Sequence, residues 1–518
     1  MCDRAILLDL LRLFAPAALS NLSDWLRPLI FNLFVSRNIK NSRLAVAEAA
    51  LELDAVGLSV MSLNLLLFAT AYGFNGAVDS YASIAFGMRD YRSLHALLLR
   101  QVLLLALLGI LALTLLVSAE TIFLRIGVDA DLAARSAALL WLMGLAVPGD
   151  FLYDAISRWM RGQQLHGQVA TCSCVALTLN LAVNLCLASQ DEPTRAPVLA
   201  LVAQNNFLPV LLIAAYLYSG VYCSKDGTDG GKSRWPSFQS CSSCICVPAM
   251  WDQLRTGIAA MVWTCAEVWA WEVQVFEAQA LGSGNAAAYT LLSSTFSLLI
   301  CVFPVSVGSA ASALIGEALG QGNVAHATRV LTTACILAML LVAGYALLLT
   351  AQRTALARLL GGGVKLVTAR YEEVLPLVLS MHLLDGLFNI LKAWLTVRKQ
   401  QAFGAGMTLF IYYGCGVPLG LWLAFPQRWG LIGLWTGLGL AVLLGCIGAG
   451  VQTTRDVGRA LAISSESFEY RRFEDRSAEL DKPNRRHLLL PFLLLPGVAA
   501  CVAVLVWRAP WHHNLAGT

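Results

Sequence analysis

Two carboxylates lie in an apolar, tryptophan-rich stretch of the chain, C-A-E-V-W-A-W-E at residues 265–272. An ionised acid at the centre of a bilayer costs about 2.5–3.5 kcal/mol on insertion scales, so Glu267 can persist only where it faces protein or a water-filled cavity. At helical spacing, Trp263, Glu267 and Trp271 fall on one face. Indole faces attract cations, and burial disfavours the charged form of a carboxyl group. We therefore expect this face to exchange a cation for a proton; the alternative is tryptophan packing and an interhelical hydrogen bond from Glu267.

The composition is that of a membrane protein. Over 518 residues the chain is 58% hydrophobic and 13% charged, and its mean hydropathy is +0.67. These values exclude a soluble globular domain and indicate an all-α polytopic fold. A span needs roughly 20 mainly apolar residues. We expect thirteen spans, near residues 13–35, 54–76, 97–118, 136–157, 168–188, 198–219, 256–280, 287–308, 329–350, 372–395, 404–424, 430–451 and 488–507.

The amino terminus is predicted to be cytoplasmic. Residues 1–9 carry charges and lack a small-residue cleavage site, so they do not read as a cleavable signal. Lys and Arg are more frequent on the side that shares the amino terminus. None of the 14 cysteines lies in a predicted outer loop, so we expect no disulfide framework. Cys241, Cys244 and Cys246 form one C-x-x-C-x-C cluster, which is weak support for zinc; membrane-proximal thiols or palmitoylation are the alternatives, and we predict no metal site.

Two short matches indicate an internal duplication. Gly87 closes a small-residue stretch at 76–87 and Gly320 closes a similar one at 309–320, an offset of 233. The pattern R-x-Q-Q-x-x-G occurs at 161–167 and at 398–404, an offset of 237. A duplicated unit of six spans keeps both copies in one orientation and places a cleft between two lobes.

The domain boundaries follow from these spans. No G-x-x-x-x-G-K-[ST] phosphate loop occurs in the chain, so transport would be driven by an ion gradient and needs no cofactor. We expect a cytoplasmic segment at 1–12, a first lobe at 13–219, a cytoplasmic linker at 220–250, a second lobe at 251–451, a cytoplasmic linker at 452–487, a thirteenth span at 488–507 and an extracellular tail at 508–518.

Other charged residues within spans need partners or a function. Asp24 and Arg27 are three residues apart, and we favour a structural pair over an ion site at Asp24. Asp385 lies near the middle of its span with Asn389 one turn further along, which favours a functional acid over a packing hydrogen bond. Lys392 is closer to the cytoplasm and is expected to extend towards it. Asp79, near the cytoplasmic end of its span, is expected to be a structural polar anchor and not a substrate ligand. Glu277 is expected to reach water at the outer end of its span.

Six stretches of the chain together suggest a family, and the resemblance extends in order over about residues 10–451. They are L-E-L-D-A-V at 51–56, G-A-V-D-S-Y-A-S-I-A-F-G at 76–87, C-A-E-V-W-A-W-E at 265–272, P-V-S-V-G-S-A-A-S-A-L-I-G-E-A-L-G-Q-G-N at 304–323, Y-Y-G-C-G-V-P-L-G at 412–420 and G-L-I-G-L-W-T-G at 430–437. In these stretches the chain resembles the multidrug and toxin extrusion (MATE) transporters, especially the vertebrate type with a thirteenth span.

The resemblance implies two six-helix lobes related by pseudo-two-fold symmetry, which export organic cations and xenobiotics in exchange for protons. It implies that Glu267, Glu272 and Asp385 bind the proton or the cation. We expect the cleft to be lined by Asn21, Asn64, Trp263, Trp269, Trp271, Thr295 and Asn389. The implied protein is a monomeric, multi-pass plasma membrane protein in contact with lipid and not with nucleic acid, and an apical location is left open.

The chain departs from the family pattern at three places. Thr295 stands where the family has an acid, Val268 stands where it has a tryptophan, and the glycine-rich pattern after the tenth span is replaced by A-W-L-T-V-R-K-Q-Q at 393–401. A sodium-coupled multidrug exporter and a transport-inactive scaffold therefore stay open. A lipid flippase with a related two-lobe fold should line its cleft with basic residues, and Arg27 is the only cation that we place deep in a span. No nucleophile or metal constellation suggests an enzyme.

Overall fold

The computed structural model describes residues 4–42, 44–187, 192–218, 246–361 and 364–464, and all its regular elements in these ranges are helical. The first half contains α1 (Arg4–Lys40), α2 (Val46–Ser62), the π-helical segment η1 (Leu63–Phe68), α3 (Ala69–Phe74), α4 (Gly76–Gly87), α5 (Tyr91–Val117), α6 (Ala119–Arg125), α7 (Ala130–Gly144), α8 (Val147–Arg161), α9 (His166–Cys186) and α10 (Arg195–Tyr218).

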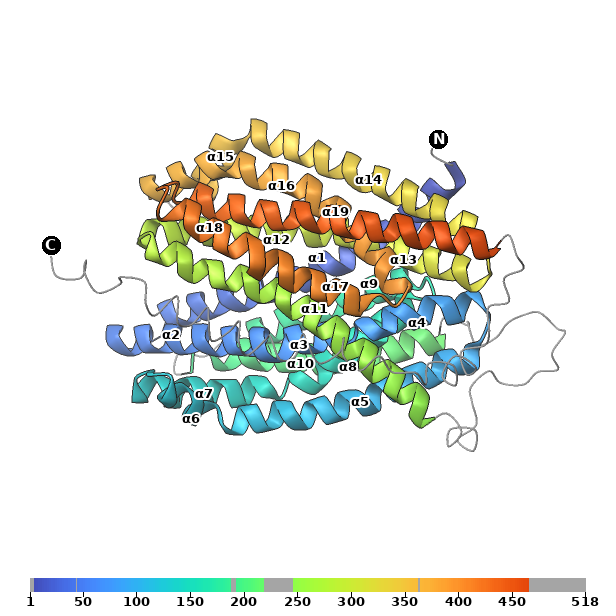
Figure 1. The fold of residues 1–518 in the computed structure, drawn as a ribbon. Helices are drawn as coiled ribbons and strands as arrows, with labels where there is room; N and C mark the ends of the chain where they lie inside the picture. The colour runs from blue at the N-terminus through green and yellow to red at the C-terminus, as the bar shows by residue number, and fades with distance from the viewer. Residues whose placement is uncertain (1–3, 43, 188–191, 219–245, 362–363, 465–518) are drawn as a thin grey trace.

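The second half contains α11 (Val247–Ala280), α12 (Ser283–Val302), α13 (Pro304–Gly320), α14 (Val324–Ala351), α15 (Arg353–Leu360), α16 (Lys365–Val397), α17 (Gln401–Leu409), the π-helical segment η4 (Phe410–Gly416), α18 (Val417–Ala424) and α19 (Leu431–Ser464). The long helices lie side by side, with most of the first half below and most of the second half above (Figure 1). Helix α1 packs against α9 of its own half and against α12 and α13 of the other.

The helices match the predicted spans. Within the described residues, ten helical segments are long and apolar enough to cross a membrane, or eleven if the bent pair α7 and α8 counts as one span. Helix α11 carries two acids and three tryptophans near its centre and is not among them. The predicted span at 136–157 is bent by 44° between α7 and α8, where Pro148 opens α8 and has no amide to continue the preceding helix. The predicted span at 488–507 lies outside the described residues, as do Cys241 and Cys244 of the cysteine cluster.

The outward faces are apolar, as a lipid environment requires. Leu107 and Ile110 of α5 are 59% and 64% exposed, and Leu340 and Leu347 of α14 are 67% and 73% exposed. Aromatic side chains fill the interior of the second half, where Trp435 of α19 packs on Tyr289 of α12 with ring centroids 5.3 Å apart. Apolar surface is therefore turned towards lipid while large rings fix the helices inside.

The duplication is visible in the helix termini. Asp90 begins α5 by accepting a hydrogen bond from the amide of Ser93 at 3.1 Å. Asn323 begins α14 in the same way, accepting from the amide of His326 at 3.0 Å. The two caps are 233 residues apart, which is the offset of the small-residue stretches.

The helices that carry these two stretches, α4 and α13, pack directly against each other. A Cβ atom at Gly87 would lie 2.3 Å from the carbonyl oxygen of Glu317, and one at Gly320 would lie 2.3 Å from that of Ile84. The contact therefore depends on the absence of side chains at both glycines.

The second repeated pattern also makes matched contacts across the lobes. Gln164, in the turn after α8, donates to Glu317 of α13. Gln401, at the start of α17 and 237 residues later, donates to Ser80 of α4. Each half thus holds the other through an equivalent glutamine, at the end of the molecule predicted to be cytoplasmic.

Candidate ion and substrate site between the lobes

A cavity of about 330 Å³ lies between the two halves. Helices α3, α4 and α8 contribute from the first half, and α11, α12 and α16 contribute from the second. Trp263, Glu267 and Trp271 all line it, as expected for residues four apart on α11. The predicted site residues that line this cavity are Trp263, Glu267, Trp271, Asp385 and Asn389.

Glu267 forms an ion pair inside this cavity. The Nζ atom of Lys392 donates to both carboxylate oxygens of Glu267 at 3.0 Å. The side chains are 18% and 21% exposed, and the ammonium also lies 4.8 Å from the centroid of the Phe388 ring. The expectation that Lys392 extends towards the cytoplasm is therefore wrong. Turning to Glu267 lets each charge offset the desolvation of the other.

Asp385 lies in the same cavity without a matching cation. The residue is 4% exposed, and its Oδ1 atom is buried without a hydrogen-bond partner. Among the described residues no basic side chain is within ion-pair distance of it. Asn389 donates to the main-chain oxygen of Asp385 at 2.8 Å. Asp385 is therefore an acid of this cavity that has no ion-pair partner among the described residues.

The aromatic side chains that line this cavity from the second half pack against one another. Trp271 packs against Phe296 and Trp435, with ring centroids 4.7 Å and 5.6 Å apart. Trp263 is 5% exposed and its Nε1 is buried without a partner in the described structure. The rings give the cavity faces that attract positive charge.

Three predicted site residues lie outside the described cavities. Glu272 and Trp269 are on α11 but line none of the three cavities described in this section. Thr295 exchanges a hydrogen bond with the hydroxyl of Tyr371 at 2.9 Å. Glu277 was expected to reach water, but it is 3% exposed and its Oε2 is buried without a partner. Helix packing at this end of α11 excludes the water that the sequence suggested.

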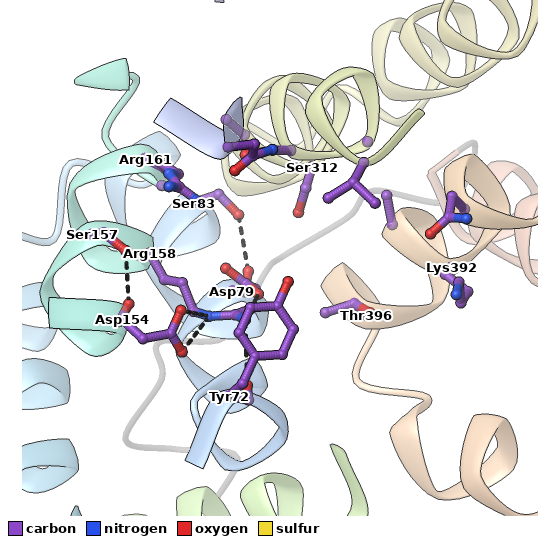
Figure 2. A pocket seen from close by; sticks show the side chains of 18 of the residues that line it. Tyr72, Asp79, Ser83, Asp154, Ser157, Arg158, Arg161, Ser312, Lys392 and Thr396 are labelled. Atoms are coloured by element: carbon purple, nitrogen blue, oxygen red, sulfur yellow. Dashed lines mark hydrogen bonds and ion pairs between the residues drawn. The ribbon is translucent and has the colours of Figure 1, made fainter. Parts of the chain in front are cut away.

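A second cavity, of about 190 Å³, adjoins the first and is strongly polar (Figure 2). The two share Tyr72, Asp79, Arg158, Val305, Asn389, Lys392 and Thr396 in their linings. Arg158 binds Asp154 at 2.9 Å and also contacts Asp79. Its guanidinium lies 4.2 Å from the centroid of the Tyr72 ring. Asp79 thus lines both cavities and is held by Arg158.

A third cavity, of about 420 Å³, lies mainly in the first half and also reaches α11; Asp24, Arg27, Asn64 and Asp150 are among the residues that line it. The predicted pair forms, with Arg27 and Asp24 2.9 Å apart. Asp150 lies 3.6 Å from the same guanidinium, and Tyr153 donates to Asp24 at 2.8 Å. Asn21 lines the second cavity and donates to Ser306 at 2.9 Å.

Sequence reasoning missed the charged face of α8. Asp150, Asp154 and Arg158 are spaced four residues apart, so they lie on one helical face, and all three line the cavities. That spacing was the available signal. The expectation that Arg27 is the only deep cation is wrong, because Arg158, Arg161 and Lys392 also line the space between the lobes.

Comparison with known proteins gives the same architecture. The family model described as MatE matches residues 16–186 and 259–422, one segment in each half. Multidrug and toxin extrusion protein 2 of Mus musculus is 27% identical over 75% of this chain, and the match spans 65% of that protein's length. Protein 1 of the same species is 27% identical over 83% of this chain and 71% of its own length. The crystal structure of a eukaryotic MATE transporter superposes with a TM-score of 0.72 at 20% identity, covering 88% of this chain and 98% of that one.

Proposed function

Because this chain belongs to the MatE family of membrane transporters, we propose that it exports organic cations in exchange for protons by alternating access between its two lobes. The observation that carries the proposal is Asp385, a buried acid with an unpartnered oxygen in the inter-lobe cavity. A carboxylate held there can be neutralised by a proton or by a substrate cation, but not by both.

The cycle follows from this competition. When the cavity faces the cytoplasm, deprotonated Asp385 and the rings of Trp263 and Trp271 attract an organic cation. When the cavity faces outward, protonation of Asp385 removes the negative charge and the cation leaves. The proton then returns inward as the lobes move back.

Glu267 has a different part in the cycle. Its charge is already matched by Lys392 at 3.0 Å, so a substrate cation gains access to this carboxylate only when the ammonium moves aside. Glu267 therefore sets how strongly the cavity attracts cations, while Asp385 exchanges them.

The test is uptake of labelled tetraethylammonium into vesicles that contain the purified protein, with an acidic interior and no sodium. We expect accumulation that collapses when the pH gradient is dissipated, that is lost in Asp385→Asn and that is reduced in Glu267→Gln. The matched control is Glu373→Gln, an acid of α16 that is 46% exposed and paired with Arg370 at the surface.

Full exchange by a folded Glu267→Gln protein contradicts the part assigned to Glu267. Accumulation only with a sodium gradient replaces proton coupling by sodium coupling. If the folded protein transports no organic cation with either a proton or a sodium gradient, the proposal is overturned. A lipid flippase and a transport-inactive scaffold then remain as the alternatives.

A further inference from the structure

Arg161, the last residue of α8, differs from the other basic residues around the two inter-lobe cavities. Its Nη2 atom donates to the hydroxyl of Ser20 at 2.8 Å. Its Nε atom is buried without a partner, and no carboxylate among the described residues lies within ion-pair distance of it. By contrast Arg158 has two carboxylates and Lys392 has one.

The internal repeat shows that this isolation is not a requirement of the local fold. Arg161 and Arg398 are equivalent in the R-x-Q-Q-x-x-G pattern, and both lie where a long helix ends. Arg398 is held by Asp456 of α19 at 2.7 Å. Arg161 instead lines the cavity of about 190 Å³. A half-buried guanidinium without a counter-charge is costly, and an anion would offset that cost.

The surroundings of Arg161 suit an oxyanion. Ser83 lies beside it and Ser312 faces both from α13 (Figure 2). Ser309, one turn before Ser312, also lines the cavity. Hydroxyl groups and a guanidinium fork are the donors that bind carboxylate or phosphate groups. Asp24, Asp79 and Asp154 line the same cavity. Asp24 is bound by Arg27, and the other two are bound by Arg158.

The position of this cavity relates it to the cation site. It shares Asn389, Lys392 and Thr396 with the cavity that contains Asp385, so one extended molecule can reach both. We propose that Arg161, Ser83, Ser309 and Ser312 form a subsite for an anionic group, and that the preferred substrates carry such a group in addition to a cationic nitrogen. The cationic end of this inference rests on the proposed function.

The test compares two substrates that differ only in the anionic group, carnitine and its methyl ester, in the vesicle assay. Carnitine has a trimethylammonium and a carboxylate, and the ester masks the carboxylate. We expect wild-type protein to prefer carnitine about tenfold, because only the free carboxylate can accept charge-assisted hydrogen bonds from the guanidinium. The ratio of carnitine uptake to methyl ester uptake should fall to about one in Arg161→Gln and recover in part in Arg161→Lys. The control, Arg370→Gln, removes a cation that is 46% exposed on α16 and should keep the preference.

Each other result has a definite meaning. Equal preference in wild type and Arg161→Gln, with both proteins folded by size-exclusion elution and circular dichroism, overturns the subsite. If tetraethylammonium is transported but carnitine is not, the inference fails and the proposed function stands. If neither is transported by folded protein, both fail. If tetraethylammonium uptake requires chloride and carnitine is not preferred, a free anion fills the cavity and the substrate inference is wrong.

Discussion

The two halves of this protein treat their buried acids differently. In the first half Asp24 and Asp150 face Arg27, and Asp79 and Asp154 share Arg158. In the second half Glu267 is paired with Lys392, and Asp385 has no ion-pair partner among the described residues. Arginine offers a planar fork that can bind two carboxylates at once, whereas lysine offers a single ammonium. The first half therefore pairs its acids with arginines, and we expect the exchangeable acid to be in the second half.

Asp385→Asn should have the largest effect. The amide keeps the shape of the side chain but cannot exchange a proton for a cation, so we expect tetraethylammonium uptake to fall at least about 100-fold, as removal of an essential proton-exchanging group does. Asp150→Asn in the first half is the comparison and should reduce uptake less than about threefold. Equal losses in the two variants would show that the halves do not differ as described.

The pH dependence should follow from the same acid. One proton competes with one cation at Asp385, so the KM for tetraethylammonium on the cytoplasmic side should rise by up to about tenfold for each unit that the pH falls within the range in which this acid titrates. Initial uptake rates over a series of pH values give this slope. The slope should be flat in any residual activity of Asp385→Asn, and a slope that persists there would place the proton elsewhere.

Two substitutions of Lys392 should shift the affinity for tetraethylammonium in opposite directions. Lys392→Met removes the ammonium that lies 3.0 Å from Glu267, so we expect the KM for tetraethylammonium to fall about tenfold, which corresponds to about 1.4 kcal/mol. Lys392→Arg gives the second half a fixed charge like that of the first and should raise KM by a similar factor.

Both Lys392 variants should still be exported to the membrane, which surface labelling checks. A KM that moves in the same direction in both variants would show that Lys392 acts through packing and not as a competing cation.

Arg158→Lys should have the smallest effect. Lysine cannot present the guanidinium fork to Asp79 and Asp154 together, so the protein should lose about 1–2 kcal/mol of stability while uptake changes less than about threefold. Thermal unfolding followed by tryptophan fluorescence measures the loss. Arg195→Lys, whose arginine is 64% exposed and pairs with Glu192, is the control and should unfold like the wild type.

The sequence was sufficient for the features that depend on spacing along one helix. Trp263, Glu267 and Trp271 share a cavity because they lie on one face of α11, and Asp24 meets Arg27 one turn away. The duplication was visible because a small-residue stretch and the R-x-Q-Q-x-x-G pattern recur at nearly the same offset. The pairing of Lys392 with Glu267 joins residues 125 apart on different helices, and helical periodicity does not say which helices are neighbours. The burial of Glu277 was missed for the same reason.

The glycine contacts between α4 and α13 have a consequence for the resting state of the protein. Gly87 and Gly320 bring two backbones together at the end of the cleft predicted to be cytoplasmic, and Gly316 leaves room for the side chain of Ser83. A methyl group at Gly87 would be 2.3 Å from the oxygen of Glu317, and the helices would have to separate. We therefore expect single methyl groups at these glycines to favour the form in which the cytoplasmic end is open, although they lie far from the acids of the cavity.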